Sequence, residues 1–189
     1  IASTNQLRWD GHQLVTGSTD GAGVVLVARS WGVFSRSKSP ILILYGGGAA
    51  ARSTAAAWAE NGGRIISVTR EGRRPLDSRG PWASALIDEV PKGSLESTFQ
   101  VDFDSQVESS IGTNTIKFDI CLVASYGRDG SVDPIQSSSG ALILDGRWML
   151  VAQHLVAWAQ FIAPEFRDSL PSLSLLLHRL SEVENGNKN

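Results

Sequence analysis

The sequence contains a single cysteine, Cys121, among its 189 residues. One cysteine excludes an internal disulfide and any cysteine-rich metal site, which suits a reducing compartment and predicts a cytoplasmic protein. The three histidines are scattered along the chain, and none stands at metal-ligand spacing from a carboxylate or from the cysteine. We therefore predict no metal site, and we expect Cys121, which lies in an apolar run, to be an inert core residue.

The chain also lacks long apolar runs and an excess of charge of either sign. No apolar stretch approaches the length of a membrane span, and nothing resembles a signal peptide. The formal net charge is -2, which gives no electrostatic reason to expect DNA, RNA or an anionic membrane as a partner. With 42% hydrophobic and 19% charged residues, the composition predicts a soluble globular domain with a real core. Because the first residue is Ile1 rather than Met, we expect a longer protein around this chain.

A glycine-rich turn between a strand and a helix is the most informative feature present. The apolar run 41–45 is rich in β-branched residues, stops at three glycines and is followed by an alanine-rich helical segment. Gly46, Gly48 and Ala51 fit the G-x-G-x-x-G/A dinucleotide pattern: a sharp turn, close approach of a pyrophosphate, and tight packing of helix on strand. The helix N-terminus offers free N–H groups and a positive dipole end to phosphates. A purely structural turn is the alternative.

A basic loop follows the second predicted strand, 64–69. In dinucleotide-binding folds the end of this strand meets the adenosine ribose, where an acidic residue suits NAD and an arginine suits the 2′-phosphate of NADP. Thr69 and Arg70 occupy this position, with Arg73 and Arg74 behind them, and guanidinium groups match phosphate oxygens. The sequence therefore favours NADP, although Glu71 favours the opposite choice and a solvated basic turn stays open.

Strand-like and helix-like segments alternate along the remaining chain. Further strands are predicted at 97–101, 116–123 and 141–144, and further helices at 24–31 (with Asp20 as N-cap), 82–90, 104–111, 149–162 and 171–183. This alternation predicts an α/β fold with a Rossmann-like, doubly wound, mostly parallel sheet and helices on both faces. A ligand is expected outside the carboxyl ends of the strands, so that Ala124 and Ser125 lie at the rim of the cleft.

Four stretches in this order resemble the shikimate dehydrogenase family. Residues 10–15 followed by 18–21 resemble its D-G-K-L-x-G-x-N-T-D-G stretch, with one extra residue between. Gly46 to Arg52 is similar to its G-A-G-G-A-x-R loop, and Thr69-Arg70-Glu71 stands where the family has N-R-T. Residues 145–153 look like its D-G-x-x-M-L-V-x-Q helix start. The resemblance covers most of the chain.

The resemblance implies hydride transfer between NADP(H) and C3 of a cyclohexene carboxylate, either 3-dehydroshikimate to shikimate or the quinate equivalent. It makes Asp20 the catalytic aspartate, which in the family pairs with a lysine to bind substrate hydroxyls and handle the proton. The implied substrate-binding residues are Ser3, Ser18, Thr19, Asp20 and Gln153. The implied cofactor-binding residues are Gly46, Gly47, Gly48, Ala49, Ala50, Arg52, Thr69, Arg70, Arg73, Ala124, Ser125 and Met149.

The chain also departs from the family pattern. The family lysine lies in an N-terminal substrate domain that this chain lacks, so we divide it into a bordering linker and helix (1–35), an NADP-binding domain (36–146) and helices that close on the cleft (147–189). Ser18 and Ser3 stand near family asparagines, and a serine cannot offer an amide's paired donor and acceptor. Activity is therefore open, and the alternative is a non-catalytic relative such as a quinate-pathway regulator. The expected partners are a small ring acid and the absent domain, and a homodimer is left open.

Overall fold

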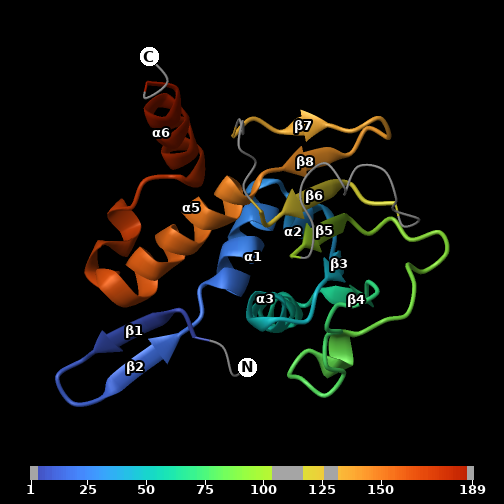
Figure 1. Cartoon of the computed structure of the whole chain (residues 1–189), viewed down its shortest axis with the longest axis horizontal. Helices are drawn as coiled ribbons and strands as arrows, with labels where there is room; N and C mark the ends of the chain where they lie inside the picture. Colours follow the sequence, from blue (N-terminus) through green and yellow to red (C-terminus); the bar gives the residue numbers. More distant parts are fainter. Residues whose placement is uncertain (1–3, 104–116, 126–131, 187–189) are drawn as a thin grey trace.

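A computed structural model of the chain describes residues 4–103, 117–125 and 132–186. At its centre is a six-stranded sheet with the strand order β4-β3-β5-β6-β8-β7, in which only β7 runs antiparallel to its neighbour (Figure 1). The strands are β3 (Ile41–Tyr45), β4 (Arg64–Val68), β5 (Thr98–Asp102), β6 (Ile120–Val123), β7 (Ile135–Gln136) and β8 (Leu142–Leu144). The apolar runs that predicted the five parallel strands are largely buried on both faces, as parallel strands require. Edge strand β7, which the sequence analysis did not predict, is exposed.

The outer edge of β4 carries one more parallel contact, from Leu86. Leu86 forms a single bridge to Ile65, and the Ile87 N–H donates to the Ile65 carbonyl at 2.8 Å. If the bridge at Leu86 is counted as the third strand in chain order, the strands lie across the sheet in the order third, second, first, fourth, fifth. This is the order of doubly wound nucleotide-binding folds. The predicted Rossmann-like, mostly parallel α/β sheet is confirmed.

The predicted helix 82–90 is wrong. The structure has one 3-10 turn there, η1 (Ala83–Ala85), followed by extended chain. The Trp82 indole is buried and donates its N–H to the Asp77 carbonyl at 2.7 Å, while Leu86 and Ile87 bond to the edge of β4. Side-chain burial and edge pairing outweigh the weak helical propensity of this segment.

Three helices pack together on one face of the sheet: α1 (Asp20–Ser30), α3 (Ala49–Glu60) and α5 (Gly146–Ala157) (Figure 1). Helix α1 lies between the other two, and the helices share one apolar core with the sheet. Fully buried Trp58 of α3 lies in this core, with its ring centroid 5.7 Å from that of Phe99 and 4.8 Å from that of Phe34. On the opposite sheet face Cys121 is buried with Val123 and Ile143, and burial raises the pKa of its thiol to about 12, in accord with an inert core cysteine.

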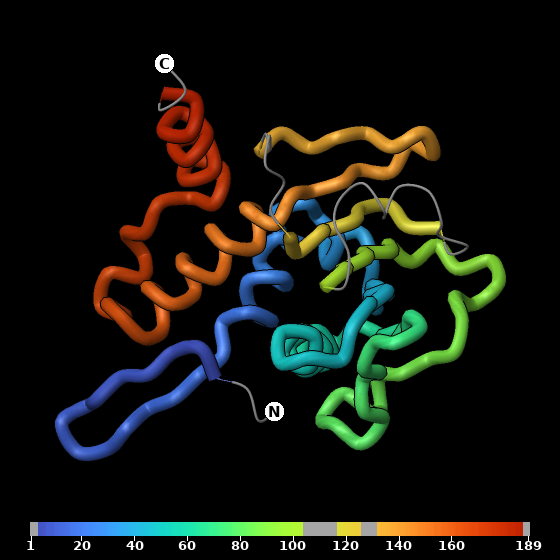
Figure 2. Tube along the Cα trace, viewed as in Figure 1, coloured from blue at the N-terminus to red at the C-terminus, as the bar shows by residue number. Residues whose placement is uncertain are grey.

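The hairpin before α1 lies outside this central body, whereas Leu173 and Leu177 of the C-terminal helix α6 (Leu173–Gly186) belong to its core. This antiparallel hairpin, β1 (Gln6–Trp9) with β2 (Leu14–Gly17), extends away from the sheet before the chain enters α1 (Figure 2). The predicted helix 149–162 begins earlier, at Gly146, and its last turn is a π-helix, η2 (Trp158–Ile162). The described residues also contain α2 (Val33–Arg36) and η3 (Pro164–Ser169). The predicted helix 104–111 lies outside the described residues.

Candidate functional site at the amino end of α3

The glycine turn after β3 leaves open space at the start of α3. Gly46 has a φ of 111°, a left-handed conformation that favours glycine and turns the chain sharply. Gly48 is the N-cap of α3, is exposed, and would have no atom within 4 Å of an added Cβ. Ala49 and Ala50 form the first helical residues, whose N–H groups have no partner within the helix. Ala51 is only 1% exposed, as close packing of helix on strand requires. The turn therefore offers backbone donors beside uncovered space.

Gly47 faces the opposite way and is covered by the basic loop. A Cβ at Gly47 would lie 2.0 Å from the Pro75 carbonyl oxygen and 2.6 Å from that of Arg74. Arg52, predicted to contact the cofactor, donates from Nη1 to the Gly47 carbonyl at 3.2 Å. The backbone of residues 74–75 thus packs against the glycine turn, and Arg52 of α3 forms a hydrogen bond to the turn from the helix side. Thr69 and Arg73 are exposed on the same loop.

Arg70 forms a bidentate ion pair with Asp102, the last residue of β5. Its Nη2 lies 2.7 Å from Asp102 Oδ2 and its Nη1 lies 3.1 Å from Oδ1. The Asp102 side chain is 0% exposed, whereas that of Arg70 is 27% exposed. The guanidinium carbon also lies 4.5 Å from the ring centroid of Tyr45, the last residue of β3. Arg70 therefore contacts the carboxyl ends of two neighbouring strands.

Asp102 is a residue that the sequence analysis missed. The available signal was a carboxylate at the end of an apolar strand, where burial of a charge demands a partner. Ala124 and Ser125 follow the carboxyl end of β6, and β5 separates β6 from β3. Ala124 donates its N–H to the Asp102 carbonyl at 2.9 Å. The strand end beside the glycine turn is therefore that of Asp102, and Ala124 with Ser125 lies one strand further along.

The predicted catalytic residue, Asp20, is the first residue of α1 rather than its N-cap, which is Thr19. Asn5 donates from Nδ2 to Asp20 Oδ1 at 2.7 Å, and its Oδ1 accepts from the Thr19 N–H at 2.9 Å and hydroxyl at 3.3 Å. Burial raises the pKa of the half-buried Asp20 carboxyl, and the Asn5 hydrogen bond opposes this. The paired amide donor and acceptor that the sequence analysis considered lost is thus present at Asn5. Predicted Ser3 lies outside the described residues.

Ser53 of α3 fixes the start of α1. Its hydroxyl oxygen accepts from the Ser18 hydroxyl at 2.9 Å and from the Gly21 N–H at 3.0 Å. A Cβ at Gly21 would lie 2.1 Å from the Ser53 carbonyl oxygen, so the two helices touch through their backbones. Five residues at a rise of 1.5 Å place Ser53 about 7.5 Å along the helix from Gly48. The substrate half and the cofactor half of the predicted site therefore meet at the amino end of α3.

Gln153 approaches the same region from α5. A Cβ at Gly23 of α1 would lie 2.9 Å from the Gln153 backbone nitrogen and 3.0 Å from its Cα. Because residues three apart share a helix face, Gly23 and Asp20 present the same side of α1. Gln153 therefore lies roughly one helical turn from Asp20, with its side chain partly exposed.

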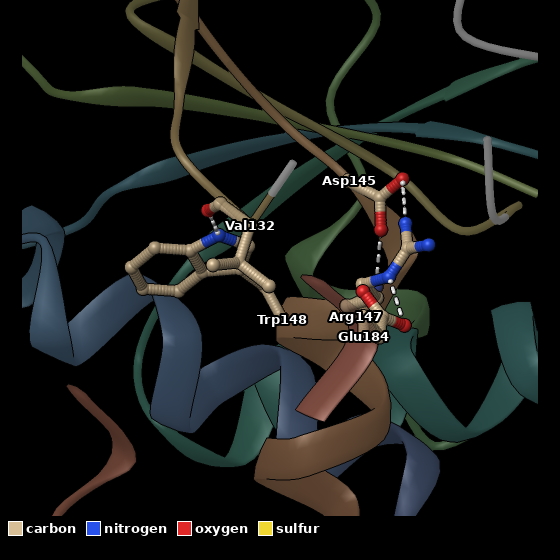
Figure 3. A network of polar contacts seen from close by, with 5 residues as sticks. All are labelled: Val132, Asp145, Arg147, Trp148 and Glu184. Carbon is tan, nitrogen blue, oxygen red and sulfur yellow. Dashed lines mark hydrogen bonds and ion pairs between the residues drawn. The ribbon is translucent and has the colours of Figure 1, made fainter. Parts of the chain in front are cut away.

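The start of α5 is held rigidly by a polar network (Figure 3). Asp145 caps the helix by accepting from the Arg147 N–H at 2.8 Å, and the Arg147 side chain bonds Asp145 at 3.0 Å and Glu184 of α6 at 2.9 Å. The Glu184 hydrogen bond and Asp145 raise the pKa of Arg147 against the effect of burial. Trp148 donates to the Val132 carbonyl at 2.7 Å. This network fixes the helix turn that carries buried Met149, a predicted cofactor residue.

The turn that begins α5 also touches the loop after β6. The Gly146 N–H donates to the Ser125 carbonyl at 3.3 Å, and a Cβ at Gly146 would lie 2.7 Å from the Ala124 carbonyl oxygen. The structure thus brings Ala124, Ser125 and Met149 together at one end of the sheet.

One further feature of the described residues lies outside this region. A cavity of about 530 Å³ opens at the carboxyl end of α3, between α1, α5 and residues 167–173, and its described lining includes no predicted site residue. Within ranges 4–103, 117–125 and 132–186, no group of three histidine, cysteine or acidic residues is placed to hold a metal ion. Nor is any helix in those ranges long and apolar enough to span a bilayer.

Comparison with known proteins gives matches among solved structures alone. No protein-family model and no curated protein matches the chain. A shikimate 5-dehydrogenase-like protein aligns over 96% of this chain and 69% of its own, with a TM-score of 0.54 and 16% identity. A chorismate mutase/shikimate 5-dehydrogenase fusion protein from Clostridium acetobutylicum aligns over 95% of this chain and 66% of its own, with a TM-score of 0.54 and 14% identity. The chain has the shikimate dehydrogenase fold.

The same fold is found in a reductase that is named for a different substrate. The 5-ketofructose reductase of Gluconobacter sp. strain CHM43 aligns over 95% of this chain and 68% of its own, with a TM-score of 0.57 and 18% identity. The chain thus spans between 66% and 69% of the length of these three proteins. At such identities the likeness establishes the shikimate dehydrogenase fold alone.

Proposed function

We propose that this chain is the nucleotide-binding part of an NADP-dependent dehydrogenase that interconverts a ketone and an alcohol on a polyhydroxylated cyclohexene carboxylate. The preferred pair is 3-dehydroshikimate and shikimate, with the quinate equivalent next. One observation carries the proposal: uncovered Gly48 at the amino end of α3 lies about 7.5 Å along that helix from Ser53, whose hydroxyl accepts from the N–H of Gly21, the residue after Asp20. The shared fold supports the same conclusion.

The residues around Gly48 fit a dinucleotide. The pyrophosphate would bind the N–H groups of Ala49 and Ala50, where a helix N-terminus favours anions. Arg70 and Arg73 of the basic loop would bind the 2′-phosphate that distinguishes NADP from NAD. When bound, the reduced cofactor supplies the hydride to the carbonyl carbon of the substrate.

Asp20 would act on the substrate side. Its carboxylate can accept hydrogen bonds from ring hydroxyls, while Asn5 holds the carboxylate in one orientation through the 2.7 Å bond. A raised pKa brings a carboxyl closer to the pH at which it can exchange a proton with the substrate oxygen. Gln153 would contribute an amide from α5. A lysine to complete the proton transfer would come from a further domain of the same protein, which we propose as the partner of this chain.

The test uses two substitutions at Gly48 that differ only in charge. Gly48 has an ordinary φ of -72° and free space around it, so Gly48→Asp and Gly48→Asn should both fold, and both side chains are good N-caps. Gly48→Asp places a carboxylate where the pyrophosphate would bind, so calorimetric titration should show NADP affinity reduced by about a hundredfold or more. Gly48→Asn is the control for bulk and should weaken binding much less. Equal NADP affinity in wild type and Gly48→Asp, or no saturable binding by wild type, contradicts the proposal.

A second candidate is a non-catalytic relative that binds the same ligands as a sensor. The observation in its favour is that Ser18, at a family substrate position, donates its hydroxyl to Ser53. The full-length protein distinguishes the two: turnover of NADP with shikimate or quinate supports the dehydrogenase, whereas saturable binding of both ligands without turnover supports the sensor.

A further inference from the structure

The Arg70 side chain lies across the carboxyl ends of strands β3 and β5, where the dinucleotide would bind. Arg70 follows the end of β4, passes over Tyr45 at the end of β3, and reaches Asp102 at the end of β5. In the sheet β3 lies between β4 and β5, so that the next strand along the chain, β4, is added on one side of β3 and the later strand β5 on the other. The strand order therefore reverses between β3 and β5. Ligands of open α/β sheets bind at this reversal point, outside the carboxyl ends of the strands. The ion pair therefore occupies the position at which adenosine and pyrophosphate would meet.

The ion pair has the features of a strong one. It has two parallel N–H···O bonds, of 2.7 and 3.1 Å, between a fork-shaped cation and a carboxylate. Asp102 is 0% exposed, so water and salt screen it little. A phosphate presents oxygens that bind a guanidinium in the same bidentate way. One guanidinium group cannot form this bidentate contact with the Asp102 carboxylate and with a phosphate at the same time.

We propose that Asp102 is a specificity-determining residue that competes with the 2′-phosphate of the cofactor for Arg70. This inference rests on the proposed function, since it requires an adenosine 2′-phosphate beside Arg70. The ion pair opens before the phosphate is bound, and Asp102 thereby sets how strongly the chain prefers NADP to NAD. The sequence pattern of the basic loop alone would assign Arg70 to the phosphate without a competitor.

The experiment compares two small probes that differ in one phosphate: adenosine 2′,5′-bisphosphate and adenosine 5′-monophosphate. Asp102→Asn keeps the shape of the side chain and removes its charge, so the bisphosphate should bind about tenfold more tightly than to wild type. Affinity for the monophosphate should stay unchanged. The gain should disappear in the double variant Arg70→Met/Asp102→Asn. Asp119→Asn, an acid-to-amide change at the amino end of β6 where Asp119 bonds Thr98, is the matched control and should change neither affinity.

Each other outcome is decisive. If the bisphosphate binds wild type and Asp102→Asn equally, the competition is refuted while the nucleotide site stands. If both probes gain equally in Asp102→Asn, the ion pair hinders nucleotide binding without any selectivity for the 2′-phosphate, and the inference fails. If neither NADP nor either probe binds any variant, the inference and the proposed function fail together.

A measurement on the wild-type chain covers the case in which Asp102→Asn does not fold. The Arg70 Nε–H resonance, assigned by its loss in Arg70→Lys, reports the surroundings of the guanidinium group. Saturating bisphosphate should shift this resonance as the pair with Asp102 opens, and the monophosphate should leave it in place. A resonance that does not move while the bisphosphate saturates the protein overturns the proposal.

Discussion

The contact between α1 and α3 gives a sharp prediction for Gly21→Ala. The added Cβ would lie 2.1 Å from the Ser53 carbonyl oxygen and 2.5 Å from its carbon, against 3.4 Å or more in ordinary contacts. Both partners are backbone, so no side chain can rotate away, and we take the upper end of the overpacking cost, about 3 kcal/mol. Strain on the hydrogen bond from the Gly21 N–H to the Ser53 hydroxyl adds about 1 kcal/mol to this cost, and the better helix propensity of alanine offsets about 1 kcal/mol of it. We expect a net loss of about 3 kcal/mol.

Urea denaturation measures this loss as a shift in midpoint at constant slope. For a chain of this length the melting temperature should fall by roughly 6–12 °C. Gly186→Ala in α6 is the matched control: nothing lies within 4 Å of its added Cβ, and stability should stay within about 0.5 kcal/mol. If Gly21→Ala is as stable as wild type, the two helices are further apart than described, and the joining of the two half-sites through Ser53 is wrong.

Two other predictions concern charged groups. Burial raises the folded-state pKa of Asp20, so the protonated form is favoured in the folded chain and the stability that it contributes is lost as pH rises. Asp20→Asn should therefore raise the melting temperature near neutral pH. This gain should vanish below pH 3.8, the ordinary pKa of an aspartate, where Asp20 is protonated in the folded and in the unfolded chain. Arg147→Met breaks a network in which Arg147 is 11% and Glu184 34% exposed, and should cost about 2 kcal/mol by urea denaturation. By contrast Arg179→Met, which breaks the exposed pair with Glu182, should leave the midpoint unchanged. A gain for Asp20→Asn that persists in acid, or equal losses for the two arginines, would count against these assignments.

Local patterns in the sequence predicted most of the framework. The β-branched runs before Gly46 and around Ile65 became neighbouring parallel strands, and the alanine-rich segment became α3. These elements agree with expectation because their burial follows directly from their composition. The prediction for segment 82–90 failed because its structure depends on contacts outside the segment: the indole N–H of Trp82 bonds the Asp77 carbonyl, and Leu86 pairs with the edge of β4.

The site divides in the same way. The open space at Gly48 follows from a local turn, and a local pattern predicted it. The partner of Arg70 does not follow from a local pattern, because the strand that lies beside β3 is determined by the order of the whole sheet. Asp102 comes within reach of Arg70 only because β5 is that strand. Asn5 was missed for a related reason: only the hairpin brings its amide back to Asp20.

The N-terminal hairpin turns its apolar side outward. Leu7, Trp9 and Leu14 are 57–66% exposed on one face, while on the other Arg8 donates to the Phe161 carbonyl at 3.1 Å. A Cβ at Gly17 would lie within 2.0 Å of the Phe161 ring, so the hairpin is seated on the π turn that ends α5. Asn5 lies one residue before β1, and its side chain donates to Asp20 Oδ1 at 2.7 Å, which lowers the pKa of this carboxyl against the effect of burial. The segment that presents the exposed apolar side chains of the hairpin is therefore continuous with the residue that tunes the Asp20 carboxyl.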